Sequence, residues 1–192
     1  MSGSGAFVAN HVSWLDILVL NASKRVVFVA KAEVAGWSGI GWLARGTGTV
    51  FLERDPKRAV EQARLLQARL AAGHTLLIFP EGTSTDGLRV VPFRTTLFAA
   101  FFGANADPDI RVQPATIAYT APKGEAATFY GWWGDASLGE SLLAVLSARP
   151  QGSVRVTYHA ALRVAEFSGR KTLAAAAEGA VRSGLSSQGR GQ

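Results

Sequence analysis

The sequence predicts a single α/β domain whose mixed, largely parallel sheet is flanked by helices. Short apolar runs of strand type alternate with helical patterns along the chain, which is the pattern of α/β proteins. The length of 192 residues suits one compact domain. Hydrophobic residues make up 48% of the chain and charged residues 18%, so a sizeable core can form. We expect the folded domain to cover residues 6–185, with flexible ends at 1–5 and 186–192.

Four short apolar runs predict the strands of the amino-terminal half, and they lie at residues 6–9, 26–30, 49–52 and 75–79. The helical segments between them are a short helix over 14–21, a helical turn over 37–44 and a long helix over 56–72. The long helix is the clearest, because Pro56 lies in its first turn and Gly73 follows its last turn.

Two further strands are predicted in the carboxyl-terminal half, over residues 111–119 and 153–159. Helices are expected over residues 93–104, 137–148 and 170–182. From Ser183 onward the chain is polar and glycine-rich, so we expect this tail to fray.

The composition narrows the classes of function. The chain has no cysteine, which excludes disulfides, zinc–thiolate sites and a cysteine nucleophile. The formal net charge of +6 favours anionic partners. Since the basic residues are spread along the chain, we expect no nucleic-acid partner. No apolar run reaches the roughly 18 residues that a membrane span needs, and the first five residues do not resemble a signal peptide.

The first candidate site is the pair His11 and Asp16. If His11 lies in a loop and Asp16 in the first turn of the following helix, their side chains can meet. Asp16 would then orient His11, whose other ring nitrogen would take the proton of an attacking alcohol. The alternative is purely structural, because Ser13 and Asp16 also fit a capping box.

The second candidate is the loop that follows the strand at 75–79. Its residues Glu81, Gly82, Thr83 and Ser84 leave the carboxyl end of that strand, where open α/β sheets place ligands. Glycine allows a close backbone approach, and the hydroxyl and amide groups can hold an anion. A simple turn would explain the same residues.

Two further positions are weaker candidates on local evidence. Arg54 lies between a strand and the long helix, where its guanidinium could grip a phosphate, although local evidence favours a surface ion pair with Glu53 or Asp55. Pro114 interrupts the strand expected at 111–119, which is also typical of a strand at a sheet edge.

These four blocks, in this order, resemble the glycerolipid acyltransferase family typified by 1-acyl-sn-glycerol-3-phosphate acyltransferase. The family's H-x-x-x-x-D, arginine, F-P-E-G-T and proline motifs match His11 with Asp16, Arg54, residues 79–83 and Pro114. The similarity covers residues 6–185, which we therefore interpret as an acyltransferase domain. It implies a glycerol-3-phosphate acyltransferase-like fold.

The resemblance implies one direct displacement without an acyl-enzyme. His11 would act as general base on the acceptor hydroxyl, with Asp16 orienting it. The acyl donor would be acyl-CoA or acyl-acyl carrier protein, with no cofactor and no metal. Arg54 and residues 81–84, with Pro114, would bind the acceptor. Because Glu81 is itself an anion, it could instead organise the loop.

The expected acceptor is 1-acyl-sn-glycerol-3-phosphate, which gives phosphatidic acid in phospholipid biosynthesis. An alternative is the O-acylation of lyso-ornithine lipid. Many family members have arginine where this chain has Ser84, and the runs at 84–87 and 131–135 resemble a bacterial subgroup that makes ornithine lipids. A non-catalytic lipid-binding module is the remaining alternative.

The expected location follows from charge and substrate. We expect peripheral attachment to the cytoplasmic face of a bacterial inner membrane, since the chain is basic and the acceptor is a lipid. The partners would be the membrane surface, a lysophospholipid or other lyso-lipid, and the acyl donor. Trp132 and Trp133 could belong to an interfacial surface.

Overall fold

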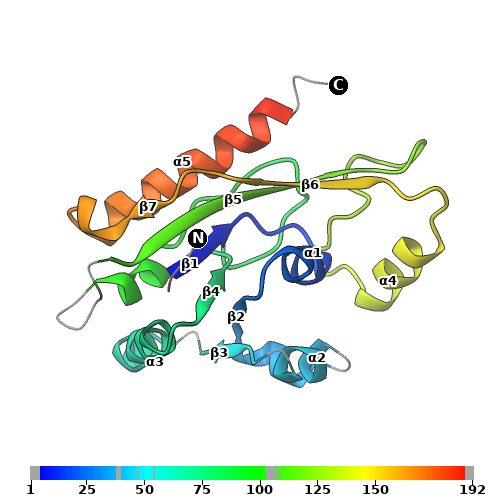
Figure 1. Ribbon diagram of the computed structural model, residues 1–192. Coiled ribbons are helices and arrows are strands. Elements are labelled where there is room, and N and C mark those ends of the chain that lie inside the picture. The colour runs from blue at the N-terminus through cyan, green and yellow to red at the C-terminus, as the bar shows by residue number, and fades with distance from the viewer. Residues whose placement is uncertain are drawn as a thin grey trace.

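Within the described residues, seven strands form one mixed sheet in the order β3-β2-β4-β1-β5-β6, with β7 beside β5 (Figure 1). The computed structural model describes residues 5–37, 40–46, 48–53, 55–102, 107 and 109–188. Strands β1 to β5 run parallel, and β6 and β7 pair antiparallel with β5. The sheet is therefore mixed and largely parallel, which confirms the predicted fold class.

The strands are β1 Gly5–Ala9, β2 Val27–Lys31, β3 Val50–Leu52, β4 Thr75–Ile78, β5 Arg111–Thr120, β6 Ser153–Tyr158 and β7 Leu162–Arg163. The α-helices are α1 Leu15–Ser23, α2 Ile40–Gly46, α3 Ala59–Ala71, α4 Leu138–Ser147 and α5 Arg170–Gln188. Short 3-10 helices cover Ala32–Gly36, Pro56–Arg58, Thr95–Phe101 and Val164–Glu166.

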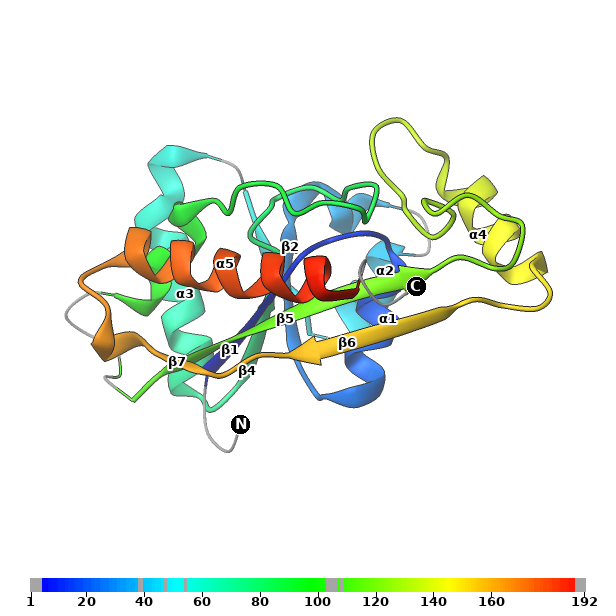
Figure 2. The same ribbon diagram turned by 90° about the horizontal axis from the view of Figure 1, so that it is seen from above.

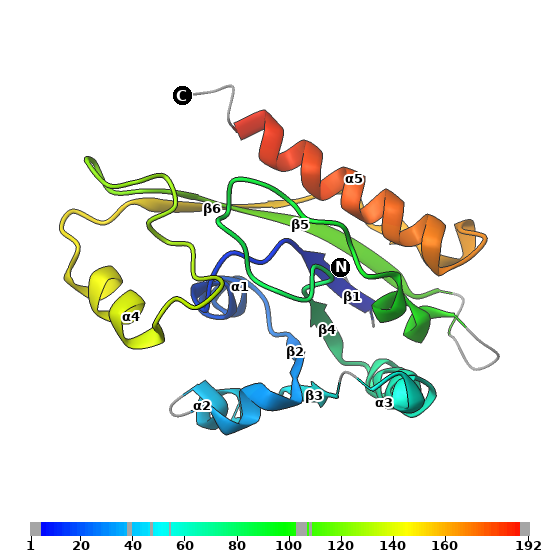
Figure 3. The same ribbon diagram turned by 180° about the vertical axis from the view of Figure 1, so that it is seen from behind.

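Helices cover both faces of the sheet because side chains alternate along each strand. In β1, Ala6 and Val8 face a core formed with α3, α5 and the 3-10 helix at 95–101. Phe7 and Ala9 face a second core formed with α1. Figure 2 shows α5 lying along β5 and β6, and Figure 3 shows α1 on the other side of the sheet from α5.

Three segments differ from the sequence-based expectation. The helix expected over 93–104 is a 3-10 helix over Thr95–Phe101, and residues 103–104 lie outside the described residues. The tail expected to fray from Ser183 is helical to Gln188, because Leu185 packs against the core. Pro114 does not lie on an edge strand, since β5 pairs with β1 on one side and with β6 and β7 on the other.

The strand order determines where the candidate residues meet. Parallel neighbours β2, β4 and β1 end at Lys31, Ile78 and Ala9. Their carboxyl ends therefore lie at one edge of the sheet, and the loops after β1 and β4 emerge there side by side. The position of this edge matches the place where ligands bind in open α/β sheets.

Candidate functional site

The structure brings His11 and Asp16 into direct contact. His11 Nδ1 lies 2.8 Å from Asp16 Oδ2. Because Nδ1 faces a carboxylate, it carries the hydrogen, and Nε2 is the nitrogen left to accept a proton. The Asp16 side chain is fully buried, whereas 21% of the His11 side chain is exposed. The His11 ring also stacks on Phe79, with 4.1 Å between ring centroids. This is the geometry of an oriented general base.

Asp16 serves the base and the helix start together. Its Oδ2 also accepts the backbone N–H groups of Val12, at 2.7 Å, and Ser13, at 3.0 Å. Only one half of the expected capping box is formed, the bond from the Ser13 N–H to Asp16. The Asp16 N–H bonds to the Ser13 carbonyl and not to its hydroxyl. Helix α1 begins at Leu15, whose N–H bonds weakly to the Ser13 hydroxyl at 3.4 Å. The same carboxylate of Asp16 can therefore orient His11 and also stabilise the start of α1.

The second oxygen of Asp16 is held by Tyr119. The Tyr119 phenol donates to Asp16 Oδ1 over 2.8 Å. Burial, together with the negative charge of Asp16, raises the pKa of Tyr119, so the phenol stays protonated. Tyr119 is thus a positioning residue for the pair. Sequence reasoning missed it, and its only signal is a polar side chain near the carboxyl end of a strand in the sheet.

Tyr119→Phe should lower kcat about tenfold, because Asp16 Oδ1 loses a hydrogen bond to a charged group. The acceptor KM should stay unchanged. Tyr130→Phe is the control, since Tyr130 packs 5.3 Å from Tyr119 but bonds to Gln151. An unchanged kcat in Tyr119→Phe, or a loss as large in Tyr130→Phe, would argue against the positioning role.

The loop that carries His11 is fixed by hydrogen bonds from distant segments. The Asn10 side chain bonds both backbone groups of Ile117 in β5, each at 2.8 Å. The Thr85 N–H donates to the His11 carbonyl over 2.9 Å, and the Trp132 N–H donates to the Val12 carbonyl over 2.9 Å. The base is therefore held in place before any substrate binds, as preorganised catalysis requires.

Glu81 ties the two motif loops together. Its carboxylate is buried, and it accepts the His11 N–H at 2.7 Å and the Val91 N–H at 2.8 Å. Burial raises the pKa of Glu81 to about 7, and the two N–H bonds act in the opposite direction. The structure thus places Glu81 in the scaffold of the loop, which is the organising role considered from the sequence.

Glu81→Gln should remove a pH dependence of stability. The raised pKa means that the folded protein binds a proton more readily than the unfolded chain, whose carboxyl titrates near 4.5. This contribution is fully present below pH 4.5 and is lost as pH rises through about 7. The unfolding free energy of wild type minus that of Glu81→Gln should therefore fall by about 3 kcal/mol as pH rises from 4.5 to above 7. Denaturant unfolding at a series of pH values measures it, with exposed Glu125→Gln as control. A pH-independent difference would contradict the assignment.

The remaining residues of the second loop, Gly82, Thr83 and Ser84, line the larger cavity. Gly82 has φ of +70°, a conformation that favours glycine. Thr83 is exposed, Ser84 is half-buried, and both line the same cavity as His11. These residues are therefore placed where a substrate in the cavity of His11 can reach them.

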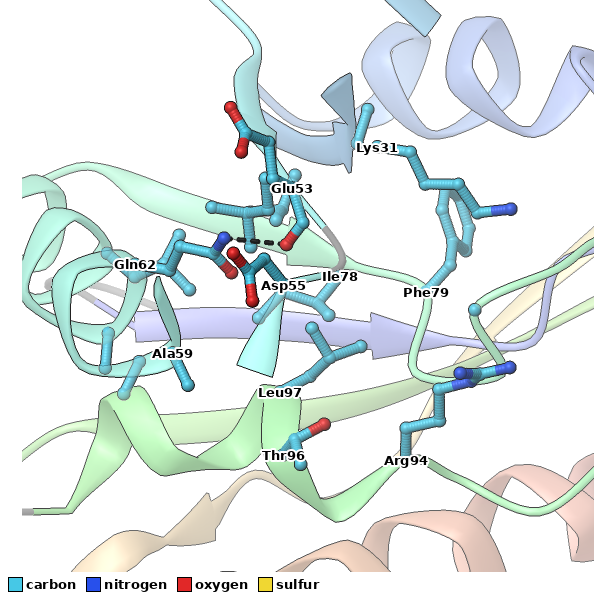
Figure 4. Close-up of a pocket in the computed structure, with 17 residues that line it drawn as sticks. Lys31, Glu53, Asp55, Ala59, Gln62, Ile78, Phe79, Arg94, Thr96 and Leu97 are labelled. Atoms are coloured by element: carbon cyan, nitrogen blue, oxygen red, sulfur yellow. Dashed lines mark hydrogen bonds between the residues drawn. The ribbon is translucent and has the colours of Figure 1, made fainter. Parts of the chain in front are cut away.

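Two cavities meet at this loop. The larger, of about 560 Å³, contains His11 and extends between α1, α2 and α4, where tryptophans line it. The smaller, of about 380 Å³, lies between the sheet, α3 and the 3-10 helix at 95–101. Both cavities are lined by the ends of β2 and β4, with the shared residues Val29, Ala30, Lys31, Phe79 and Gly82. In Figure 4 the smaller cavity has Lys31 and Arg94 on the Phe79 side and Asp55 and Gln62 on the α3 side.

Two residues suggested by the sequence are not joined to this geometry. Arg54 lies outside the described residues, although its neighbours Glu53 and Asp55 line the smaller cavity. Pro114 is buried in β5, opposite Val8 of β1, and it is not among the residues that line the two cavities. A substrate-binding role for either residue stays a prediction.

Arg94 is a site residue that sequence reasoning missed. It follows the second motif by ten residues and returns to it, because its N–H donates to the Pro80 carbonyl over 2.8 Å. Its side chain lies across Gly82 and lines the smaller cavity. No motif pointed to it, since its position depends on the path of the loop at 85–93.

Metal-binding clusters and membrane-spanning helices are both missing from the described part of the chain. In those ranges, no group of three His, Asp or Glu side chains is arranged to hold a metal ion. Nor does any helix within them combine the length and apolar character of a membrane span.

Comparisons with known proteins identify the family of the chain. Residues 2–118 match the family model described as Acyltransferase. The chain is 55% identical over 190 residues to a lyso-ornithine lipid O-acyltransferase of Rhodobacter capsulatus. The matched region covers 99% of this chain and 69% of the relative. It is 37% identical over 99 residues to a 1-acyl-sn-glycerol-3-phosphate acyltransferase of Neisseria gonorrhoeae, which covers 51% of this chain and 39% of that relative.

A solved structure shares the fold as well. The 1-acyl-sn-glycerophosphate acyltransferase of Thermotoga maritima superimposes with a TM-score of 0.65 at 25% identity, covering the whole of this chain and 68% of the other. The resemblance based on four short motifs is thereby confirmed at the level of family and fold. The chain belongs to the acyltransferase family, and it is an O-acyltransferase.

Proposed function

We propose that the protein transfers an acyl group from an acyl thioester to the free hydroxyl of a lyso-ornithine lipid. The observation that carries acyl transfer is the 2.8 Å contact between His11 and buried Asp16 at the wall of a cavity of about 560 Å³. The acceptor rests on the relative that is 55% identical over nearly the whole chain. This favours the alternative acceptor over 1-acylglycerol-3-phosphate, the acceptor expected first from the motifs.

The proposed reaction is a single displacement. As the acceptor oxygen bonds to the thioester carbonyl carbon, its proton passes to Nε2 of His11. Asp16 stabilises the imidazolium that forms, as its negative charge lies next to Nδ1. The tetrahedral intermediate then collapses, the carbon–sulfur bond breaks, and the thiol leaves with the proton from Nε2. No covalent enzyme intermediate is required.

The two cavities support a reaction between two acyl-bearing substrates. Each cavity is lined largely by apolar side chains, and they meet at Phe79, on which His11 stacks. An acyl chain of the donor and one of the acceptor can therefore approach the base from two sides. Acyl-CoA and acyl-acyl carrier protein are the donor classes that fit this reaction.

A second acceptor is supported by specific relatives. Lysophosphatidate would be acylated by the same geometry, and the Neisseria gonorrhoeae relative and the Thermotoga maritima structure carry that name. The deciding experiment offers the purified protein each acceptor with a radiolabelled acyl donor. We expect a higher kcat/KM with lyso-ornithine lipid. A preference for lysophosphatidate would overturn the proposed acceptor, and transfer to neither would favour a lipid-binding module.

Peripheral membrane attachment is the location we propose, because lyso-lipid acceptors reside in bilayers. The mouth of the larger cavity is surrounded by exposed apolar side chains: Leu18, Trp37, Trp133 and Leu142. Helix α4 extends this surface with Leu143, 70% exposed, and Leu146, 66% exposed. In Figures 1 and 3, α4 and α2 lie at the same end of the molecule. This apolar end would place the cavity mouth against the bilayer.

Leu143→Glu with Leu146→Glu should weaken binding to vesicles by at least tenfold, since about 1.5–3 kcal/mol of apolar burial is lost per leucine. Vesicle sedimentation without donor or acceptor measures it. Val60→Glu with Leu65→Glu on α3, at the far end of the molecule, is the matched control. Unchanged binding in the α4 variant would argue against this surface. The basic net charge predicts a separate component that weakens as salt rises.

A further inference from the structure

The Arg94 side chain is held across the second motif loop at the rim of the smaller cavity. Its Nε donates to the Glu81 carbonyl over 3.4 Å, and its backbone N–H is bound to Pro80. A Cβ on Gly82 would lie 2.6 Å from Arg94 Nε and 2.9 Å from its Cδ. The glycine of this loop therefore leaves the space that the arginine stem occupies. The guanidinium is fixed at its Nε end and open beyond it.

Among the described residues, Arg94 carries its positive charge without an ion pair, because no carboxylate there lies within ion-pair distance of its guanidinium. The nearby carboxylate of Glu81 is already occupied by the N–H groups of His11 and Val91. Arg94 is exposed and lines the smaller cavity, and Figure 4 shows it on the same side of that cavity as Phe79. An anion at this position would gain a charge-assisted bond from a preorganised donor.

We propose that Arg94 binds the α-carboxylate of the acceptor's ornithine headgroup, an inference that rests on the proposed function. Arg94 and Phe79 both line the smaller cavity, and His11 stacks on Phe79 in the adjoining larger cavity. A carboxylate held by Arg94 thus anchors the headgroup next to the base, while the acceptor hydroxyl lies at His11 Nε2. Ser84, two residues beyond Gly82, carries no charge, so the motif residues 81–84 supply no competing cation.

The experiment compares lyso-ornithine lipid with its carboxyl methyl ester, which lacks the negative charge. Binding is followed by intrinsic tryptophan fluorescence without donor, because Trp37, Trp132 and Trp133 line the adjoining cavity. Wild type should bind the acid at least about tenfold more tightly than the ester. Arg94→Ala should bind both alike, and Arg94→Lys should restore part of the difference, since lysine keeps the charge but loses the planar fork. A variant Arg94→Ala that still discriminates like wild type would overturn the proposal.

Two further measurements distinguish a specific contact of Arg94 from a general effect of charge and from a contact with the donor. Arg89→Ala removes a cation from the same loop, where Arg89 is 70% exposed and pairs with Asp86, and it should leave the discrimination unchanged. An equal loss in Arg89→Ala would show a general effect of charge and overturn the proposal. The phosphates of acyl-CoA have similar chemistry, so a rise of the donor KM in Arg94→Ala without a rise of the acceptor KM would also overturn it.

The readouts separate this inference from the proposed function. Carboxylate-dependent binding needs no turnover, so its absence in wild type overturns the role of Arg94 alone. Turnover that prefers lysophosphatidate overturns the proposed acceptor, while an effect of Arg94→Ala on lysophosphatidate KM would show that the same guanidinium takes a phosphate instead of a carboxylate.

Discussion

His11→Ala should lower the rate of acyl transfer by at least about 10²–10⁴-fold, because the reaction loses its general base. No other histidine of the described chain lines the two cavities. Substrate binding should change little, since the cavity walls stay in place. Steady-state kinetics with a radiolabelled donor measures kcat and both KM values.

The matched control for this variant is His159→Ala. His159 bonds to Thr116 through Nε2 at 2.7 Å, and it lies outside both cavities. This substitution removes another imidazole side chain and leaves His11 and its contacts unchanged. We expect kcat to remain near the wild-type value in this variant. Substantial transfer by a folded His11→Ala protein would rule out the general-base assignment.

Asp16→Asn should be almost as damaging, with a loss of roughly 10²–10⁴ in kcat. The asparagine oxygen can take the place of Oδ2 and accept the N–H groups of Val12 and Ser13. Its amide group can then face Tyr119, whose phenol oxygen accepts as well as donates. The helix start is kept, and only the negative charge beside His11 is lost.

This substitution separates the two tasks of Asp16 because stability and rate should respond differently. Unfolding by denaturant should show a change of about 1 kcal/mol or less for Asp16→Asn. Asp16→Ala, which loses the hydrogen bonds as well, should be less stable in addition to being inactive. Full activity of Asp16→Asn would reduce Asp16 to a structural residue at the helix start.

The elements with a regular pattern can be predicted from the sequence. Short apolar runs locate strands such as the one near 6–9, and Pro56 with Gly73 bounds the long helical segment. The segment at 93–104 is expected to be an α-helix because an apolar run gives no distinction between α and 3-10 geometry. Its true form depends on packing against α3 and α5, which no local pattern contains.

The candidate site also contains some contacts that can be predicted from the sequence and others that cannot. His11 and Asp16 lie five positions apart, so a loop followed by a helix turn is enough to predict their contact. Tyr119 reaches the same carboxylate from 103 positions away. That contact depends on the pairing of β5 with β1, and no spacing in the sequence reveals it. A loop-organising role of Glu81 can be suggested from its charge, but its partners cannot be predicted, because they are backbone groups, which leave no sequence signal.

The loop that carries His11 is fixed by contacts between segments that are distant in sequence, with Thr85, Trp132 and the Asn10–Ile117 pair supplying them. Such a loop has no independent local unfolding step, because it can open only when those other segments separate from it. Its amide hydrogens would exchange with solvent on the timescale of the central strands. Heat would then inactivate the enzyme at the temperature at which the sheet itself melts, and the active site would not fail before the fold.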